Sequence, residues 1–376
     1  MKLARYMGGG QIAILEEDPP ECPPGGLLVR TEASGLCSGE LMDWYMDRKI
    51  PHVLGHEVAG IVVESQDSRF PVGCRVAPHH HAPCMSCELC QRGAYVHCEQ
   101  WKRTKLVPGG MAEFFAVGAE NLTDTHVVSP WPLRPGDASP DGYSGETPEP
   151  HIADSTGLRP IDAALMEPLG CVVKSLRKAC PVPPIDGLPR NRVAIIGTGT
   201  MGLLHLLLLP RPSNRGAECG MCGEIPQETS GTLPHSVVGY ELNPARRQWA
   251  IELGVDARSP TDSIPADVIV VCPGTEAALR FAISISAPGA TICLFSPLGP
   301  PNALTLSTDD LYFRDIDLIT SYSCGPDHTA AALDILQAGR VKAEQVVSHF
   351  ISIDELHAAY QAMKRGEILK PMVVFD

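Results

Sequence analysis

The chain has 376 residues, 44% of them hydrophobic and 20% charged, so it is long enough to bury two ordinary cores. Asp and Glu number 44 against 30 Lys and Arg, and the net charge of −14 disfavours nucleic acid and anionic membranes as partners. The first residues lack the apolar core of a signal peptide, which places the 14 cysteines in a reducing compartment. We therefore expect a cytoplasmic protein that acts on a small molecule.

Three segments contain possible ligands of a catalytic zinc ion. Cys37 precedes Ser38, His56 and Glu57 lie in a Gly-His-Glu triplet, and Glu167 lies in Met-Glu-Pro-Leu. Cysteine, histidine and glutamate from distant positions can converge on zinc and leave one position open for substrate. Each segment also has a simpler interpretation, because a single cysteine is commonly a small buried hydrophobe and the triplet commonly a turn.

Four cysteines lie within fifteen residues: Cys84, Cys87, Cys90 and Cys98. Their intervals of three, three and eight residues are typical of a closed, structural zinc site. A ferredoxin-type iron–sulfur cluster is disfavoured because Glu99, not proline, follows the last cysteine. Disulfides are disfavoured because cysteines three apart pair poorly and no secretory segment is recognisable.

Two stretches rich in Pro, Gly and Ser, 130–160 and about 211–235, predict loop insertions. The second contains Cys219 and Cys222, a spacing that suits metal or redox chemistry, although a pair of loop thiols is the simpler interpretation. The run His79–His81 could recruit a metal, but on a loop after a strand it is rather expected to be solvated or to support neighbouring groups.

A strand, a glycine turn and a helix are predicted from Arg192 onward. The strand covers 192–196, the helix begins near Met201, and the turn comprises Gly197, Thr198, Gly199, Thr200, Met201 and Gly202. In a dinucleotide-binding unit the first glycine permits the turn, the second admits a pyrophosphate and the third lets the helix pack on the strand. Other strand-turn-helix units share this pattern, so alone it is not specific.

Glu241 ends the next predicted strand, where dinucleotide-binding units hold the adenosine ribose. It follows Gly202 by 39 residues rather than the usual ~20, because the second insertion interrupts the connection. A carboxylate there favours NAD over NADP, whose phosphate it would repel, while Arg246 could pair with that phosphate or stack on adenine. Further strands and helices alternate after it, which predicts a parallel, doubly wound α/β sheet.

In this order the motifs, together with Gly109–Phe114 and the segment from Ala338 to Lys370, resemble the zinc-dependent medium-chain dehydrogenases. The sorbitol and threonine dehydrogenase branch is the most similar. The resemblance implies a GroES-like, mostly β catalytic domain over 1–170 with a zinc lobe at 84–98. It also implies a Rossmann NAD-binding domain over 171–324 and a return to the catalytic domain over 325–376.

The resemblance also implies roles for single residues. Cys37, His56 and Glu167 match the catalytic-zinc positions, with Glu57 either a direct ligand or a group that exchanges with water. Two zinc ions per chain follow, one catalytic and one structural. The relay serine or threonine of the family lies two residues after the cysteine, where this chain has Gly39, so Ser38, a water molecule or Glu57 would replace it.

Three functions agree with these motifs. The first is NAD-dependent oxidation of a secondary alcohol, such as a polyol, cyclitol, sugar derivative or hydroxy amino acid. The second is zinc-assisted reduction of a ketone or aldehyde, since one site serves both directions. The third is a non-catalytic, dinucleotide-binding redox sensor, against which the retention of Cys37, His56 and Glu167 argues. A homodimer or homotetramer is the family expectation.

Overall fold

The computed structural model describes residues 1–129, 157–180, 192–209, 236–300 and 305–376. They form two compact units, Met1–Glu167 with Cys324–Asp376, and Pro168–Ser323. The limits expected from the sequence lie within a few residues of these divisions. Most of the insertion at 130–160, and all of the insertion at 211–235 with Cys219 and Cys222, lies outside the described residues.

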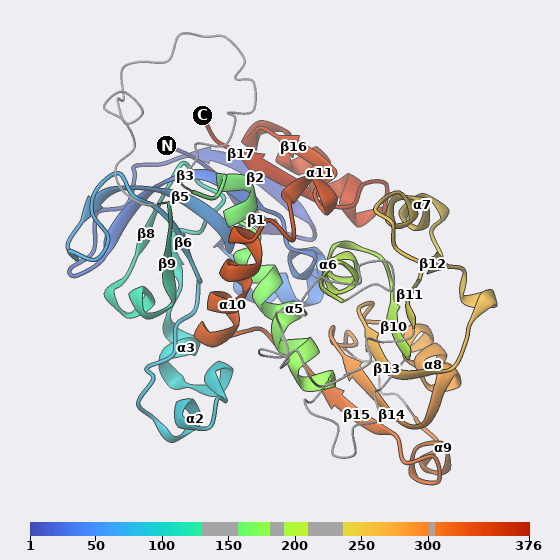
Figure 1. Cartoon of the computed structure of the whole chain (residues 1–376). Coiled ribbons are helices and arrows are strands. Elements are labelled where there is room, and N and C mark those ends of the chain that lie inside the picture. The colour runs from blue at the N-terminus through green and yellow to red at the C-terminus, as the bar shows by residue number, and fades with distance from the viewer. Residues whose placement is uncertain (130–156, 181–191, 210–235, 301–304) are drawn as a thin grey trace. The chain divides into compact units, whose positions relative to one another are not determined.

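The first unit is mostly antiparallel β structure (Figure 1). A three-stranded sheet has the order β2 (Gln11–Glu16), β1 (Lys2–Gly8) and β4 (His52–Val53). The larger sheet follows the path β16 (His349–Ile351), β17 (Pro371–Val374), β3 (Leu27–Gly35), β5 (Glu57–Ser65), β6 (Arg75–Pro78) and β9 (Thr125–Ser129). Strand β8 (Phe114–Val117) pairs with β3 and with β7 (Leu106–Val107).

Short helices connect these strands. They are α1 (Asp43–Met46), α2 (Glu88–Gln91), α3 (Glu99–Arg103), α4 (Pro160–Ala163), α10 (Pro326–Gln337) and α11 (Leu356–Lys364), with 3₁₀ turns that include η1 (Ser38–Leu41), η3 (Tyr95–His97) and η4 (Ala119–Asp124). The C-terminal segment returns to this unit through β17, where Val373 pairs with Ser34, and through α11, whose Tyr360 packs in one core with Tyr6. The first unit is therefore built from both ends of the chain.

The second unit contains a six-stranded parallel sheet. Its order is β12 (Ala257–Arg258), β11 (Ser236–Tyr240), β10 (Arg192–Ile196), β13 (Ala266–Val271), β14 (Ser286–Leu294) and β15 (Asp317–Thr320). The helices are α5 (Met166–Ala179), α6 (Thr200–Leu208), α7 (Pro244–Glu252), α8 (Glu276–Ile285) and α9 (Thr308–Tyr312). This is the strand order of the Rossmann fold, so the predicted doubly wound α/β sheet is confirmed.

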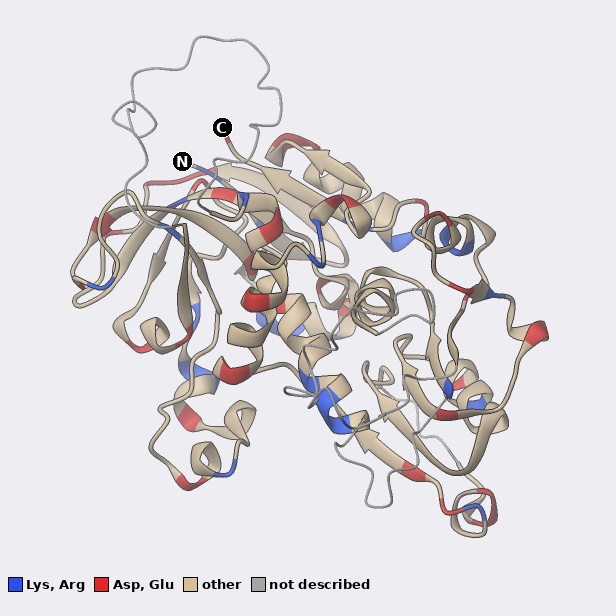
Figure 2. Ribbon diagram, in the orientation of Figure 1, with Lys and Arg blue, Asp and Glu red and all other residues tan. Residues whose placement is uncertain are grey.

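Basic residues gather in the C-terminal half of α5 (Figure 2). Lys174 donates to the carbonyl of Tyr322 at 2.7 Å, and Lys178 donates to the carbonyl of Thr320. Both lysines thus form hydrogen bonds from α5 to backbone carbonyls at the end of β15 and just beyond it. Within the described part of the chain, none of the helices combines the length and the apolar character needed to cross a membrane.

Candidate metal centres and dinucleotide site

The four-cysteine lobe has the geometry of a metal centre. The sulfur atoms of Cys84, Cys87, Cys90 and Cys98 all lie within 4.8 Å of one another. Cys90 Sγ lies 3.5 Å from Cys87 Sγ and 3.9 Å from Cys84 Sγ, against about 3.8 Å between thiolates on tetrahedral zinc. Hydrogen bonds from the hydroxyl and backbone of Ser86 and from the backbone of Cys87 lower the pKa of Cys84 to about 5, which favours a thiolate. These donors fit zinc.

A second donor group arises from the pairing of β3 with β5. Gly35, the last residue of β3, pairs with Glu57, the first residue of β5. Cys37 follows β3 by two residues and His56 precedes β5 by one, so this register brings both beside Glu57. The ligand atoms of all three lie within 4.8 Å of one another. A thiol, an imidazole and a carboxylate so placed suit zinc.

Glu40 orients the histidine of this group. Its Oε1 lies 3.3 Å from His56 Nδ1 and accepts the N–H of Gly55 at 2.8 Å. Burial alone raises the pKa of Glu40, but the charge and hydrogen bond of His56 outweigh burial and lower it to about 2. With Nδ1 taken up by Glu40, Nε2 of His56 is left for a metal. We did not predict this role of Glu40 from the sequence.

Lys370 holds the carboxylate of the same group. Its ammonium group binds Glu57 Oε2 and donates to the carbonyl of Leu36 at 2.9 Å. Both Lys370 and Glu57 are about 1% exposed, so the two charges compensate each other away from water. The second carboxylate oxygen of Glu57 remains as an acceptor or ligand.

Ser38 is the exposed first residue of η1, and the neighbouring Gly39 donates its N–H to Cys37 Sγ at 3.3 Å. The suggested role of Ser38 in proton transfer stays a prediction.

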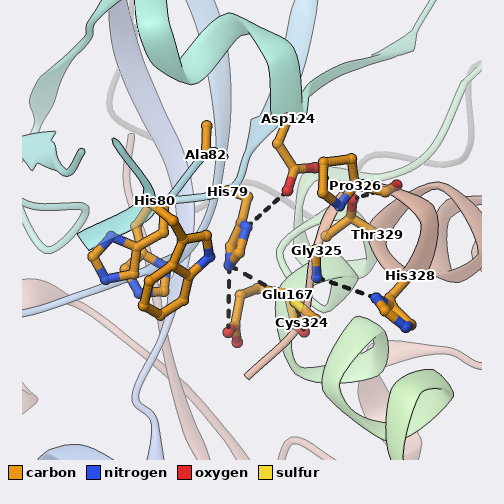
Figure 3. Close-up of polar contacts among 12 residues, drawn as sticks. His79, His80, Ala82, Asp124, Glu167, Cys324, Gly325, Pro326, His328 and Thr329 are labelled. Atoms are coloured by element: carbon orange, nitrogen blue, oxygen red, sulfur yellow. Dashed lines mark hydrogen bonds and ion pairs between the residues drawn. The ribbon is translucent and has the colours of Figure 1, made fainter. Parts of the chain in front are cut away.

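Glu167 belongs to a different group of donors, with His79 and Cys324 (Figure 3). Three of the four ligands predicted for the catalytic zinc are thus brought together, and the fourth is grouped elsewhere. Of the two roles expected for the histidine run, His79 has the second: it is 0% exposed, and its Nδ1 lies 2.8 Å from Oδ2 of the neighbouring Asp124. Sequence reasoning missed Cys324 and Asp124, which no local motif marks.

The glycine turn has the shape that a dinucleotide needs. Gly197 has φ +82°, which favours glycine, and a Cβ on Gly202 would lie 1.8 Å from the carbonyl oxygen of Gly197. A Cβ on Gly199 would meet no atom within 4 Å in the described structure, so this side of the turn is open. The three glycines thus match the turn, the approach of a ligand and the close packing of the helix.

Polar groups around the turn suit a pyrophosphate and a ribose. The Thr200 hydroxyl, at the N-terminus of α6, is buried and has no hydrogen-bond partner among the described residues, and the same holds for Arg246 Nε. Glu241 accepts the N–H of Thr198 and the N–H of Asn243, each at 2.8 Å. An open helix N-terminus with an unpaired hydroxyl is suited to bind an anion.

Comparison with known proteins agrees with this arrangement. Residues 23–127 match the alcohol dehydrogenase GroES-like domain. The chain is 27% identical to D-altritol 5-dehydrogenase of Agrobacterium fabrum over 372 residues, which cover 95% of this chain and 94% of the relative. It is 25% identical to L-threonine 3-dehydrogenase of Pyrococcus horikoshii over 389 residues, with 96% and 94% covered.

A solved structure shows the same fold over the full length. It is a zinc-binding dehydrogenase of Sinorhizobium meliloti bound to NADP, with a TM-score of 0.75 and 22% identity, and the match covers 100% of this chain and 99% of that one. The chain thus combines a GroES-like domain, a parallel six-stranded sheet and grouped metal donors. Along most of its length the chain is similar to dehydrogenases of this kind, as the predicted resemblance to the zinc-dependent medium-chain dehydrogenases implies, and the predicted GroES-like fold is confirmed.

Proposed function

We propose that the protein oxidises a secondary alcohol and transfers the hydride to NAD, with Cys37, His56 and Glu57 as the donors of a catalytic zinc site. The observation that carries this function is the convergence of these three ligand atoms within 4.8 Å, next to an orienting carboxylate from Glu40. When bound there, zinc would supply the positive charge that lowers the pKa of a substrate hydroxyl.

The residues of the chain contribute position and charge. Glu40 fixes the ring of His56, and Lys370 fixes the carboxylate of Glu57, so neither ligand has to be ordered when a metal binds. Glu167, a predicted ligand by family resemblance, lies with His79 and Cys324 instead. Ser38 is the proposed group that removes the hydroxyl proton, and Glu57 or a water molecule is the alternative.

The proposed cofactor site is the glycine turn of the second unit. Gly199 would admit the pyrophosphate, with Gly197, Thr198, Thr200, Met201 and Gly202 completing the turn. The open side at Gly199 and the unpaired hydroxyl of Thr200 support this assignment. Glu241 would accept the ribose hydroxyls, which favours NAD, and Arg246 would stack on the adenine or pair with a phosphate.

The substrate class rests on the relatives, which act on D-altritol and L-threonine. Both compounds carry a secondary hydroxyl beside other polar groups, so we place the substrate among polyols, cyclitols, sugar derivatives and hydroxy amino acids. Reduction of the corresponding ketone is the same reaction in reverse.

Two further features complete the proposal. Cys84, Cys87, Cys90 and Cys98 would hold a structural zinc, which makes at least two zinc ions per chain. A homodimer or homotetramer is supported by β15, an edge strand whose surroundings expose Tyr312, Phe313, Leu318 and Tyr322.

The deciding experiment is a panel of polyols, cyclitols and hydroxy amino acids with NAD, followed by the absorbance of the reduced nicotinamide. A member of the panel is expected to give turnover that Cys37→Ala lowers by at least about a hundredfold, as for loss of metal support. Cys74→Ala, which changes a buried cysteine outside the donor groups, is the matched control. Absence of turnover with every compound, or full turnover in Cys37→Ala, would refute the proposal.

A further inference from the structure

His79, Glu167 and Cys324 form a buried donor set in the first unit that the proposed reaction does not use. His79 and Cys324 are 0% exposed, Glu167 is 7% exposed, and their ligand atoms all lie within 4.8 Å of one another. Figure 3 shows the imidazole of His79 directed toward both the Glu167 carboxylate and the Cys324 sulfur. We propose that these three residues bind a further zinc ion, with a fourth position open to water or another small ligand.

The distances suit a tetrahedral ion. His79 Nε2 lies 3.7 Å from Cys324 Sγ and 4.0 Å from Glu167 Oε1. Zinc bonds of about 2.0 Å to nitrogen and oxygen and about 2.3 Å to sulfur place such atoms about 3.6 Å and about 3.3 Å apart. The nitrogen–sulfur pair has nearly this separation. The Glu167 oxygen would have to move about 0.7 Å closer to His79 Nε2 to reach its own.

The surroundings of His79 match those of a metal-bound histidine. Asp124 Oδ2 lies 2.8 Å from His79 Nδ1, so a proton on Nδ1 leaves Nε2 as the electron-pair donor. Asp124 is itself held by the Thr329 hydroxyl, and its Oδ1 lies 3.2 Å from His126 Nε2. A carboxylate that orients the imidazole from behind is a usual feature of zinc sites.

The charge of the set also favours a divalent cation. Asp124 and Glu167 are buried carboxyl groups in contact with opposite nitrogens of one imidazole. A proton on His79 would compensate one negative charge, whereas a divalent ion at Nε2 would compensate both Glu167 and a Cys324 thiolate. Buried charges of one sign are costly without such compensation.

The backbone holds Cys324 in place. Gly325 follows it and lies against the ring of Tyr95, where an added Cβ would lie 2.3 Å from a ring carbon. Pro326 then begins α10, and Thr329 in its first turn binds Asp124. The segment that carries Cys324 is therefore tied, through Thr329, to the same Asp124 that orients His79, as a preorganised site requires.

The test compares zinc contents of the full-length protein after equilibration with excess zinc and gel filtration. Cys324→Ala is expected to bind one zinc fewer per chain than Cys74→Ala, which removes another buried thiol of the first unit. With cobalt in place of zinc, Cys324→Ala should lose part of the thiolate-to-cobalt absorption that Cys74→Ala retains. Circular dichroism and the melting temperature confirm that both variants are folded.

A second variant keeps the ligands intact. Asp124→Asn retains an acceptor for His79 but loses the charge, and it is expected to weaken one zinc site by about 10- to 100-fold in competition with a chromophoric chelator. Equal zinc contents in Cys324→Ala and Cys74→Ala, or unchanged zinc affinities in Asp124→Asn, would overturn the proposal. Failure of the proposed dehydrogenase reaction would show separately, as absence of turnover with every compound of the panel or as full turnover in Cys37→Ala.

Discussion

The Glu241 carboxylate has two tasks in one position. It accepts N–H groups from Thr198 and Asn243, and so it shapes the glycine turn as well as facing the proposed ribose. A substitution that removes the whole side chain would remove both backbone contacts, whereas the isosteric amide keeps one of them and removes the charge.

Glu241→Gln keeps an oxygen for the Thr198 N–H, gives up the acceptor for the Asn243 N–H, and removes the charge that would repel the 2′-phosphate of NADP. We expect the NADP/NAD ratio of kcat/KM to rise by at least about tenfold, equivalent to about 1.4 kcal/mol. Steady-state kinetics with both cofactors measures it, and Glu252→Gln on the exposed face of α7 is the control. An unchanged ratio would remove Glu241 from cofactor selection.

Ser38 is the residue for which the structure argues least, because its side chain is exposed. If it transfers the proton, Ser38→Ala should lower kcat by roughly a hundredfold and change the pH profile of turnover. Ser68→Ala, another exposed serine of the first unit, should leave both unchanged. Wild-type kinetics in Ser38→Ala would assign the step to Glu57 or water.

At the scale of elements, α6 carries a pH-sensitive histidine in its interior. His205 is 0% exposed, its Nδ1 lies 2.7 Å from the carbonyl oxygen of Met201, and its Nε2 contacts the Ser175 hydroxyl. Burial lowers the pKa of His205 from 6.5 to about 4, because the charged ring would lose its hydration.

The unfolded chain therefore binds a proton at a higher pH than the folded one. The contribution of the neutral His205 to the free energy of unfolding is complete above pH 6.5. It is lost as the pH falls toward 4, by up to about 3 kcal/mol. His205→Gln should flatten this part of the profile in urea unfolding measured from about pH 4 to about pH 7. Parallel profiles for the two proteins would contradict the assignment.

The zinc lobe is a second element with a testable stability. Its small apolar cluster consists of Tyr95, Val96, Trp101 and the cysteines themselves, so the lobe has little core without a metal. Cys90→Ala should bind one zinc fewer, and its free energy of unfolding should fall by about 3 kcal/mol or more. This change lowers the melting temperature by about 5–10 °C. Cys22→Ala, outside the donor groups, is the control, and an unchanged melting temperature in Cys90→Ala would show that the lobe folds without metal.

What could be predicted from the sequence was local. The glycine turn and the four-cysteine lobe are short segments whose spacing fixes their geometry, and both have the expected shape. The pairing of Cys37 with His56 needed only the register of two neighbouring strands. The group of His79 and Cys324 joins positions 245 residues apart, and Glu167 joins it because of packing that no periodic pattern encodes.

At the scale of the whole molecule, the proposed cofactor site and the proposed metal sites lie in different units. The glycine turn belongs to the second unit, and all three groups of metal donors among the described residues belong to the first. NAD at about 100 times its Kd is expected to stabilise the unit that binds it by about 2.7 kcal/mol.

Hydrogen–deuterium exchange can show which unit responds to NAD and which to removal of zinc. NAD should give its largest protection at residues 197–202 and 241–246, whereas a zinc chelator should increase exchange most at 84–98. The protein without either addition is the reference. Protection by NAD that is absent from 197–202 would show that the turn is not the cofactor site.

The ion pair between Lys370 and Glu57 links positions 313 residues apart. During synthesis on a ribosome, the donors Cys37, His56 and Glu57 emerge early, but Glu57 meets its lysine only after the entire second unit has followed. A metal captured by the nascent chain would therefore bind a carboxylate that still faces water. The proposed catalytic centre reaches its final form as one of the last events in making the protein, although its ligands are among the first residues made.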